Sequence, residues 1–489
     1  MDTLAQQPKA TFENELHGWI NQEKAAVELI NLISTMWFDR SVELLIFRNT
    51  LYNRSNNEIL NLHTYADKVM NQPISIYDTV EVARALSQTE LSPSRIDIGR
   101  LTTEWTKERG SFANINDFLS KKINYIIGSE KRVLEPKDVV LYGFGRIGRL
   151  AARELIAQAG KGEQLRLRAI VTRSNSDSDI TKRAALLRTD SVHGPFFANI
   201  VEDLANKSLI INGHNVQMIA AKNPEDVDYE SYGISNALVI DNTGVFRDRD
   251  GLGRHLQAKG VSKVLLTAPG KGNIPNIVHG VNHESFDINN EQIFSAASCT
   301  TNAIVPPLKV LHDKLGIIRG HIETIHSYTN DQNLLDNFHS KSRRGRSAAL
   351  NMVLTETGAN SAITKVVPEL AGKFTANAVR VPTPDVSIAI LNLTVSRDTS
   401  VEEANEILRD AALNGDLVEQ IQFSTDTELV STDLIGNPCA SIIDSPNTLI
   451  SQDKRSIVVY AWYDNEYGYT RQVMRLAKHL ADVVRLRYY

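Results

Sequence analysis

The sequence lacks most features that mark secreted, membrane-bound or nucleic-acid-binding proteins. Its 489 residues include only two cysteines, too few for a disulfide framework. It contains no run of about 18 apolar residues, so we expect no membrane span. A net charge of −5 gives no general attraction to nucleic acid. The first residues, Met1-Asp2-Thr3-Leu4, do not resemble a signal peptide, and no cysteine–histidine cluster has zinc spacing. We therefore expect a cytoplasmic protein without a metal site.

Glycine and proline are scarce at the start of the chain. Residues 1–133 hold 4 of the 27 glycines and 3 of the 15 prolines. Apolar residues recur there at helical spacing, in stripes that run from Phe12 to Ile30, from Val42 to Leu51, from Tyr77 to Leu86 and from Phe118 to Ile126. Ser75 is a candidate cap for the third helix. We expect residues 1–133 to form an all-helical domain that serves in packing or assembly, or alternatively in regulation.

A glycine-rich turn follows the apolar run Val139-Val140-Leu141-Tyr142. The turn reads Gly143-Phe144-Gly145-Arg146-Ile147-Gly148 and leads directly into a predicted helix at 149–159. In this context the first glycine permits the turn, the second admits a pyrophosphate and the third allows close packing of helix and strand. The helix N-terminus then binds the phosphates. The pattern predicts a dinucleotide site. A glycine turn in another kind of α/β unit is the alternative.

The end of the next predicted strand bears on the choice between NAD and NADP. Sites for NAD usually present a carboxylate there, to bind the ribose 2′-hydroxyl. This chain has Thr172-Arg173-Ser174 instead, and Asp177 and Asp179 follow in an expected loop. Arg173 can bind a 2′-phosphate, which favours NADP or weak discrimination. Alternatively, Arg173 is a solvated surface charge.

Two further apolar runs also end in polar loops, as expected for a doubly wound parallel sheet. They lead to Asn242-Thr243-Gly244 and to Thr267. Ligands bind beyond the carboxyl ends of such strands. We therefore expect these loops to take part in cofactor binding.

The stretch Ser298-Cys299-Thr300-Thr301-Asn302 lies between a predicted buried strand and a predicted helix. A helix N-terminus and its free amide donors lower the pKa of a thiol from about 8.5, which favours the nucleophilic thiolate. The hydroxyl groups on either side are suited to binding an oxyanion or a phosphate. A lone cysteine is otherwise most often a small buried core residue.

Taken together, these motifs resemble the phosphorylating glyceraldehyde-3-phosphate dehydrogenases. The resemblance rests on the glycine turn and the cysteine stretch, together with Asp190-Ser191-Val192-His193-Gly194, His326-Ser327-Tyr328-Thr329-Asn330-Asp331-Gln332, Arg380-Val381-Pro382-Thr383 and Trp462-Tyr463-Asp464-Asn465-Glu466-Tyr467-Gly468-Tyr469. It covers residues 137–489. It implies a Rossmann domain at 134–299 that is completed by a C-terminal helix at 465–489, and an α+β catalytic domain at 300–464.

The resemblance also implies roles for individual residues. Cys299 attacks the aldehyde and His326 acts as its base, giving a thioester that inorganic phosphate cleaves. The nicotinamide is held at Asn465, near Tyr469. The phosphate of glyceraldehyde 3-phosphate binds at Thr329, Asp331 and Arg380, where Asp331 orients a neighbour because a carboxylate does not favourably bind phosphate. The attacking phosphate binds at Ser298, Thr300, Arg346, Thr357 and Gly358, although Arg346 belongs to a basic run that is alternatively a solvated face.

The family is usually a homotetramer, so we expect a homo-oligomer that binds neither nucleic acid nor membrane. Two other functions stay open. An erythrose-4-phosphate dehydrogenase passes its thioester to water, and a non-catalytic regulatory protein would act through residues 1–133.

Overall fold

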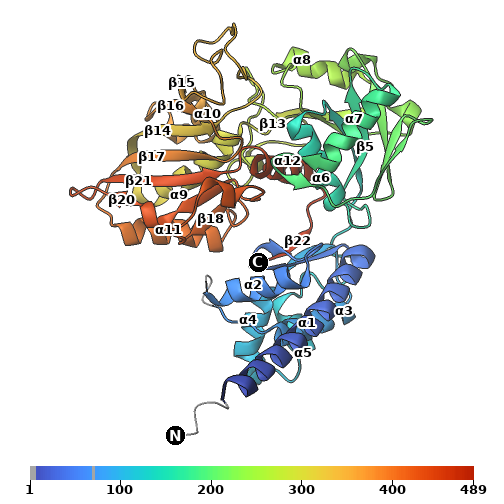
Figure 1. Ribbon diagram of the computed structural model, residues 1–489, viewed down its shortest axis with the longest axis vertical. Coiled ribbons are helices and arrows are strands. Elements are labelled where there is room, and N and C mark those ends of the chain that lie inside the picture. The colour runs from blue at the N-terminus through green and yellow to red at the C-terminus, as the bar shows by residue number, and fades with distance from the viewer. Residues whose placement is uncertain (1–6, 69–71) are drawn as a thin grey trace. The chain divides into compact units, whose positions relative to one another are not determined.

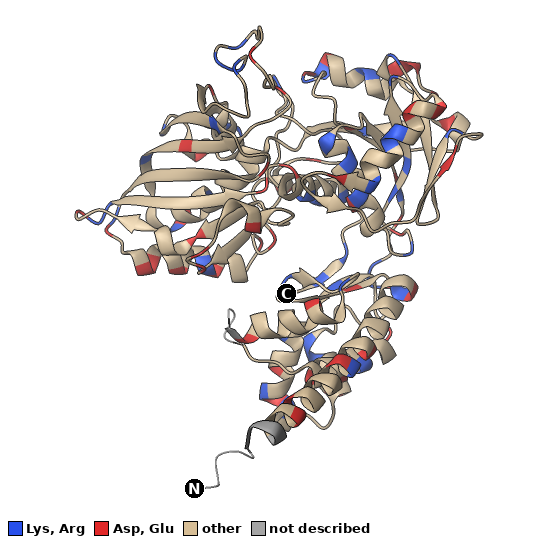
Figure 2. Ribbon diagram, in the orientation of Figure 1, with Lys and Arg blue, Asp and Glu red and all other residues tan. Residues whose placement is uncertain are grey.

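The computed structural model describes residues 7–68 and 72–489. The chain folds into two compact units. The small unit comprises the residues up to Glu135, together with Gly160–Gln164 and Val483–Tyr489. The large unit comprises Pro136–Ala159 and Leu165–Asp482. No helix in the described ranges is both long and apolar enough to cross a membrane. Acidic and basic residues are interspersed in both units, in keeping with the small net charge (Figure 2).

The small unit is mainly helical, as predicted (Figure 1). The side chain of Ser75 caps the third helix, also as predicted, by accepting a hydrogen bond from the N–H of Asp78. Asp97 and Asn114 cap the next two helices in the same way. The helices are α1 (Gln7–Arg40), α2 (Asn56–Lys68), α3 (Ile76–Gln88), α4 (Ile98–Glu108) and α5 (Ile115–Lys122).

The small unit is not wholly helical, however. The apolar stripe from Val42 to Leu51, predicted as helix, forms β1 (Val42–Ile46) and β2 (Asn49–Thr50), and β3 (Ser94–Asp97) lies further along the chain. All five residues of β1 are buried. A strand buried on both faces shows no regular alternation of polar and apolar residues. Its hydrophobic pattern therefore does not distinguish it from a segment of buried helix.

A strand from the far end of the chain completes the small sheet, whose order is β2-β1-β3-β22. Strand β22 (Leu486–Tyr488) pairs in parallel with β3, so that Leu486 lies opposite Ser94 and Tyr488 opposite Ile96. The guanidinium of Arg485, just before this strand, lies 4.5 Å from the ring centroid of Trp37. The small unit therefore needs residues from both ends of the sequence.

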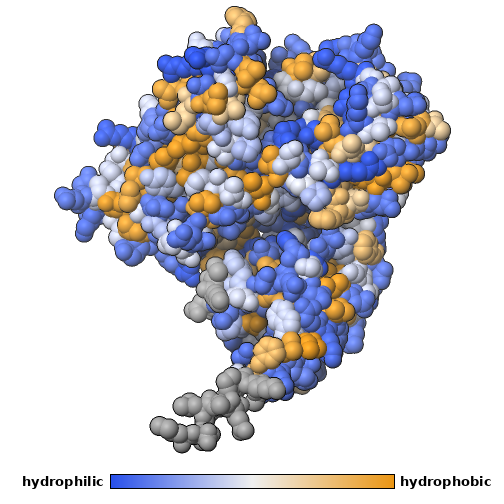
Figure 3. All heavy atoms as spheres, viewed as in Figure 1, coloured by the Kyte–Doolittle hydropathy of each residue, from blue (hydrophilic) through white to orange (hydrophobic). Residues whose placement is uncertain are grey.

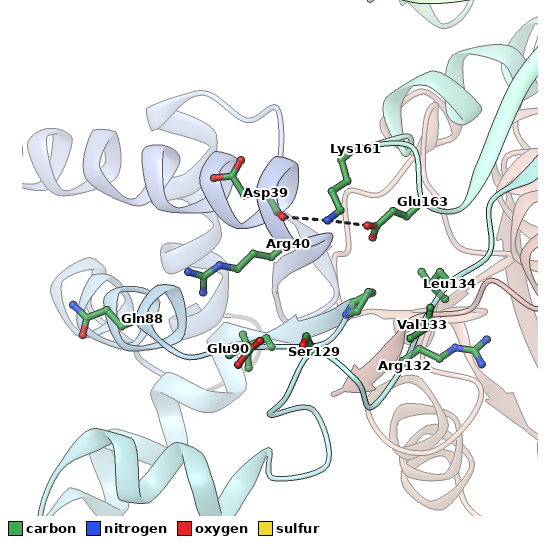
Figure 4. A pocket seen from close by; sticks show the side chains of 12 residues that line it. Asp39, Arg40, Gln88, Glu90, Ser129, Arg132, Val133, Leu134, Lys161 and Glu163 are labelled. Carbon is green, nitrogen blue, oxygen red and sulfur yellow. Dashed lines mark hydrogen bonds and ion pairs between the residues drawn. The ribbon is translucent and has the colours of Figure 1, made fainter.

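A hollow of about 520 Å³ opens in the small unit (Figure 4). Its wall carries both signs of charge. The basic residues include Arg40 and Lys161, and the acidic residues include Glu90 and Glu163. Nζ of Lys161 lies 2.7 Å from Glu163 and 3.2 Å from the backbone oxygen of Asp39. The wall therefore carries no excess of charge of either sign.

The first sheet of the large unit is the predicted doubly wound sheet, with strand order β13-β12-β11-β4-β5-β10-β9-β8. The strands from β13 to β10 pair in parallel, and β9 and β8 are antiparallel additions. Its elements are β4 (Lys137–Tyr142), α6 (Arg146–Ala157), β5 (Leu165–Thr172), α7 (Asp177–Arg188), β8 (Ile200–Asp203), β9 (Ser208–Ile211), β10 (His214–Ala220), β11 (Ala237–Asp241), α8 (Arg249–Gly253), β12 (Val261–Leu266) and β13 (Ile293–Ser295); the small pair β6 (Thr189–Asp190) and β7 (Gly194–Pro195) stands apart.

The second sheet has the order β15-β16-β14-β17-β21-β19-β18, and β20 pairs with β21. Helix α9 packs against this sheet through its buried apolar face. The C-terminal helix predicted at 465–489 corresponds to α12, which is shorter than predicted and ends at Leu480. The elements are α9 (Cys299–Leu315), β14 (Ile317–Ser327), β15 (Val353–Thr355), α10 (Ala359–Val366), β16 (Phe374–Val381), β17 (Ser387–Val395), α11 (Val401–Leu413), β18 (Ile421–Ser424), β19 (Ser441–Asp444), β20 (Leu449–Ile450), β21 (Ser456–Tyr463) and α12 (Tyr467–Leu480).

Candidate active site

Cys299 is the first residue of α9, at the turn that joins the two sheets of the large unit. Ser298 caps the helix, because its hydroxyl accepts a hydrogen bond from the N–H of Thr301 at 3.0 Å. Ala297, just before it, has a φ of 56°, in the left-handed region that L-residues rarely adopt. This tight turn places Cys299 at the end of the first sheet, where it also packs against the core beneath α9.

The structure brings Cys299 and His326 together. Sγ of Cys299 lies 3.7 Å from Nε2 of His326, which sits near the end of β14. The other ring nitrogen, Nδ1, lies 2.7 Å from the backbone oxygen of Ser327. Nη1 of Arg380 also lies 3.0 Å from Nδ1. In the tautomer that carries its proton on Nδ1, the ring donates to the Ser327 oxygen and Nε2 is an acceptor directed at the thiol; in the other tautomer, Nδ1 accepts from Arg380. The guanidinium of Arg380 also donates to the Ser327 oxygen, at 2.7 Å.

Burial decides the protonation of this pair. It raises the pKa of the Cys299 thiol, although the Arg380 charge and the N–H of Thr300 act in the opposite direction. It also lowers the pKa of His326 to about 3, and the Arg380 charge adds to this effect. The expectation that the helix N-terminus gives a lowered thiol pKa is therefore wrong for the free site, since desolvation outweighs the helix. At neutral pH the pair is a thiol beside a neutral imidazole.

The glycine turn has the geometry that a pyrophosphate requires. Gly143 has a φ of 94°, and a Cβ on Gly148 would lie 2.4 Å from the backbone oxygen of Gly143. Side chains are therefore excluded at both positions. Gly145 precedes the first turn of α6 and has open space where a Cβ would stand. The residues thus fit a dinucleotide at the N-terminus of α6.

A buried carboxylate fixes the neighbouring loop. Oδ1 of Asp241 accepts hydrogen bonds from both the N–H and the hydroxyl of Thr243, each at 2.7 Å. Its Oδ2 lies 3.1 Å from Nε2 of the buried His255. The hydroxyl of Thr267 donates to the Asp241 backbone oxygen at 3.0 Å. Asp241 and His255 were not singled out from the sequence, although the carboxylate lies at the end of a predicted strand.

The end of β5 differs from the expected loop. Asp177 and Asp179 begin helix α7, and the side chain of Ser176 caps it. Oγ of Ser174 donates to Oδ2 of Asp179 at 2.5 Å, so this carboxylate lies close to the strand end. Arg173 is exposed there. The structure therefore places a cation and an anion within a few residues of the strand end.

Asn465 and Tyr469 reach the site from the start of α12. Oδ1 of Asn465 accepts a hydrogen bond from Oγ of Ser387 at 2.7 Å, which leaves the amide NH₂ for the cavity. The hydroxyl of Tyr469 donates to the backbone oxygen of Ala297 at 3.0 Å and thereby braces the Cys299 turn. Ser387 was missed in the sequence because nothing local to it marks a contact with a residue 78 positions away.

Most of the predicted catalytic, substrate and cofactor residues line one cavity of about 670 Å³. Predicted residues that line it are Arg146, Ile147, Thr243, Gly244, Thr267, Ser298, Cys299, His326, Thr329, Asp331, Arg380, Asn465 and Tyr469. The predicted substrate-phosphate set, Thr329, Asp331 and Arg380, is thus brought together. Gly143, Phe144, Gly145, Gly148 and Arg173 are not among the lining residues.

The predicted site for the attacking phosphate is only partly assembled. Thr300 is buried and its hydroxyl lies 3.1 Å from that of Tyr463. Thr357 and Gly358 precede α10 and do not line the cavity. Arg346 is also outside it, with a side chain 65% exposed and paired with Asp336 at 2.9 Å.

Arg344, two residues earlier, is the buried arginine of this basic run. It pairs with Asp331, and its Nε donates to Oγ1 of Thr355 at 3.0 Å. No feature of the sequence distinguishes it from its neighbours in Arg343-Arg344-Gly345-Arg346.

A partly buried charged network borders the cavity. The guanidinium of Arg146 donates to both oxygens of Glu466 at 2.5 Å and to both oxygens of Asp190 at 3.1 Å. Nε2 of His193 lies 3.1 Å from Glu466 and 3.4 Å from Asp385. Burial, and then the charge of Asp464, raises the pKa of Asp385 to about 9. His193, Asp385 and Glu466 have the spacing of metal ligands, but Arg146 already supplies Glu466 with a cation.

Comparison with known proteins agrees with this geometry. Residues 137–249 match the sequence pattern described as the glyceraldehyde 3-phosphate dehydrogenase NAD binding domain, and residues 298–465 match that of the C-terminal domain. A glyceraldehyde-3-phosphate dehydrogenase 2 from Trichormus variabilis is 42% identical over 344 residues, which is 70% of this chain and 98% of the relative. A glyceraldehyde-3-phosphate dehydrogenase from Zymomonas mobilis is 39% identical over 71% of this chain and 99% of the relative.

One relative also covers most of the N-terminal region. A glyceraldehyde-3-phosphate dehydrogenase-like protein from Pseudomonas aeruginosa is 48% identical over 458 residues. The alignment spans 93% of this chain and 98% of the relative. The small unit is therefore similar to part of a known protein, whereas the two relatives above match only about 70% of the chain.

Proposed function

The chain belongs to the glyceraldehyde-3-phosphate dehydrogenase family of oxidoreductases, and on this basis we propose that it oxidises glyceraldehyde 3-phosphate to 1,3-bisphosphoglycerate with NAD or NADP. The observation that carries the proposal is the 3.7 Å approach of Cys299 Sγ to His326 Nε2. The pair lies in the same cavity as the dinucleotide loops and Arg380. A nucleophile, a base and an anion-binding arginine are the groups that this reaction requires.

The thiol of Cys299 gives its proton to Nε2 of His326 as sulfur attacks the aldehyde carbon, and His326 returns that proton to the carbonyl oxygen, so that a hemithioacetal forms. His326 then accepts the proton of the hemithioacetal hydroxyl as the carbon is oxidised to a thioester. Phosphate attacks the thioester carbon and the C–S bond breaks. The acyl phosphate is released, and the departing Cys299 sulfur takes the proton back from His326. Because the thioester keeps the energy of the oxidation, the product is an acyl phosphate instead of a free acid.

Arg146, Ile147, Thr243, Gly244 and Thr267 would hold the dinucleotide, and Asn465 would orient its nicotinamide through the free amide NH₂. When bound, the dinucleotide supplies the acceptor for the hydride that leaves the substrate carbon. Thr329 and Arg380 would bind the substrate phosphate, and Asp331 would orient a neighbouring group in the same cavity. Arg344 neutralises Asp331, which otherwise repels an anion.

Tolerance of NADP is part of the proposal, and it rests on the exposed Arg173 at the end of β5. A homotetramer in the cytoplasm is also part of it. The support is the family pattern and the two cysteines, neither of which forms a disulfide.

A second candidate function is favoured by one observation. Arg346, Thr357 and Gly358 do not line the cavity, so the proposed site for inorganic phosphate is incomplete in this conformation. An enzyme of the erythrose-4-phosphate dehydrogenase type, which passes its thioester to water, does not need that site.

Initial rates of NADH and NADPH formation, measured with each aldehyde in the presence and absence of phosphate, separate these functions. The proposed reaction requires phosphate and gives an acyl phosphate that hydroxylamine traps. The second candidate gives equal rates without phosphate. Cys299→Ser should abolish both reactions, whereas Cys439→Ser should abolish neither. If Cys299→Ser retains the wild-type rate, both mechanisms are wrong and a non-catalytic role is favoured.

A further inference from the structure

The cofactor end of the active-site cavity has less positive charge than its arginine content indicates. A dinucleotide carries a negative charge on each phosphate of its pyrophosphate, whereas a helix N-terminus such as that of α6 supplies roughly half a positive charge. Arg146, the first residue of α6, lines the cavity, but Glu466 and Asp190 both pair with its guanidinium. Net positive charge at this end of the cavity must therefore come from another side chain.

Arg247 is such a side chain, since it is exposed and lines the same cavity. Its Nε donates to the backbone oxygen of Gly244 at 3.0 Å, which holds the guanidinium against the loop that follows β11. Among the residues that the structure describes, no carboxylate pairs with Arg247, and the adjacent Asp248 accepts a hydrogen bond from the N–H of Gly251 as the cap of α8. Hydrophilic residues cover much of the visible surface (Figure 3), so an exposed cation is informative here because it lacks an ion pair and lines a cavity.

Strand pairing brings the loop that carries Arg247 to the glycine turn. Strand β11 pairs in parallel with β4, so the loops that follow both strands leave the same edge of the sheet. The N–H of Asn242 donates to the backbone oxygen of Tyr142 at 2.8 Å. A Cβ on Gly143 would lie 3.0 Å from Cγ2 of Thr243. The loop therefore contacts the turn at which a pyrophosphate is expected.

The order of the strands separates Arg247 from the other phosphates of the reaction. In the first sheet, β4 lies between β11 and β5. Arg173, proposed for the 2′-phosphate of NADP, follows β5, whereas Arg247 follows β11. The substrate phosphate is expected at Arg380, which donates to the backbone oxygen of Ser327 beside His326. The phosphate group that NAD and NADP both place at the end of β4 is the pyrophosphate.

We propose that Arg247 binds the pyrophosphate of the dinucleotide, together with the N-terminus of α6, and thereby contributes equally to the affinity for NAD and NADP. This inference rests on the proposed function, because it requires that the cavity binds a dinucleotide. A guanidinium suits the role, since its planar donors can bind two phosphate oxygens at once and it keeps its charge at neutral pH. The role differs from that of Arg173, which would discriminate between the two cofactors.

Equilibrium binding to the full-length protein tests this role without turnover. Arg247→Gln should raise the Kd for NAD, NADP and ADP-ribose about tenfold each in isothermal titration calorimetry, because all three ligands carry the pyrophosphate. Arg247→Lys keeps the charge and should raise these Kd values only about threefold. Lys271→Gln is the matched control. Lys271 is an exposed cation outside the cavity whose N–H donates to the Arg247 oxygen at 2.7 Å, and its loss should leave every Kd unchanged.

Steady-state kinetics of Arg247→Gln separates the pyrophosphate from the other phosphates. KM for glyceraldehyde 3-phosphate and KM for inorganic phosphate should both stay within about twofold of the wild type. A rise in either of these values with an unchanged Kd for NAD would overturn the proposal and assign Arg247 to that phosphate. A rise in Kd for NADP alone would assign it to the 2′-phosphate instead.

Two further outcomes separate this inference from the proposed function. If the wild type binds NAD and Arg247→Gln binds all three ligands equally well, Arg247 is a solvated charge and the proposed function stands. If the wild type binds neither NAD nor NADP, the proposed function and this inference are both wrong.

Discussion

The hydroxyl of Ser387 donates a hydrogen bond to Oδ1 of Asn465 at 2.7 Å, and it accepts one from the N–H of Ser327 at 3.1 Å. One buried side chain therefore links the residue after His326 to the residue proposed to hold the nicotinamide. The bond also fixes the orientation of the Asn465 amide, because its oxygen is occupied and its NH₂ is directed to the cavity.

Loss of this bond is expected to weaken dinucleotide binding more than it slows the chemistry. Ser387→Ala removes one hydrogen bond worth about 1 kcal/mol, so KM for the dinucleotide should rise about fivefold while kcat changes less than twofold. Steady-state kinetics checks this. Ser441→Ala is the control, since Ser441 is equally buried but its hydroxyl has no hydrogen-bond partner among the described residues. Equal kinetics for Ser387→Ala and the wild type would show that Asn465 is oriented by other groups.

The pH dependence of Cys299 reactivity follows from its burial. The thiol pKa is raised and the pKa of His326 is lowered to about 3. Thiolate therefore forms as pH rises, and the alkylation rate of the free protein by iodoacetamide should increase about tenfold per pH unit up to at least pH 9. No step is expected near pH 6.5, where an ordinary histidine titrates. A rate that is constant from pH 6 to 9 would indicate a preformed thiolate–imidazolium pair.

The charge of Arg380 also affects the pKa of the Cys299 thiol. Its charge lowers the thiol pKa, so Arg380→Gln should shift the alkylation profile to higher pH. Alkylation, followed by mass spectrometry at Cys299, is independent of substrate binding and so separates this effect from the proposed phosphate role. Lys365→Gln, a change at another cation of the large unit, should leave the profile in place. A shift to lower pH in Arg380→Gln would contradict the electrostatic account.

Cofactor choice is expected to depend on Arg173. Arg173→Ala should raise KM for NADP about tenfold and leave KM for NAD within twofold, because only NADP carries a phosphate for this guanidinium. Lys182→Ala, which removes another exposed cation on α7, should affect neither cofactor. If Arg173→Ala leaves the NADP-to-NAD ratio unchanged, Arg173 is a solvated charge.

The pairing of the C-terminal strand β22 with β3 predicts different outcomes for two truncated chains. Removal of residues 1–135 leaves β22 without its partner β3 and exposes Tyr488, which is buried in the small core. This truncated chain should aggregate, because an unpaired strand edge associates readily. Removal of 483–489 as well should give a soluble protein that binds dinucleotide, as followed by quenching of intrinsic fluorescence. Aggregation of both truncated chains would show that the large unit needs the small unit to fold.

Local motifs could be predicted because their physical requirements are local. The turn at Gly143 needs a positive φ, and contact between Gly148 and the Gly143 oxygen excludes a side chain. The strand, turn and helix around Cys299 are equally encoded in consecutive residues. The loops at Thr243 and Thr267 could also be predicted to meet at the cavity, since the carboxyl ends of parallel strands meet at one edge of a sheet. His326, Arg380 and Asn465 were expected there from the resemblance to a family.

The sequence by itself determined the family, the doubly wound sheet and the position of Cys299 at a helix start. Only the tertiary structure decided that Val42–Ile46 is a strand, that β22 completes the small sheet and that Arg344 is buried where Arg346 is exposed. It also reversed the expected direction of the Cys299 pKa shift. The reason is common to all four. Burial and strand pairing depend on residues far away along the chain, and both desolvation and packing are set by neighbours that no local pattern records.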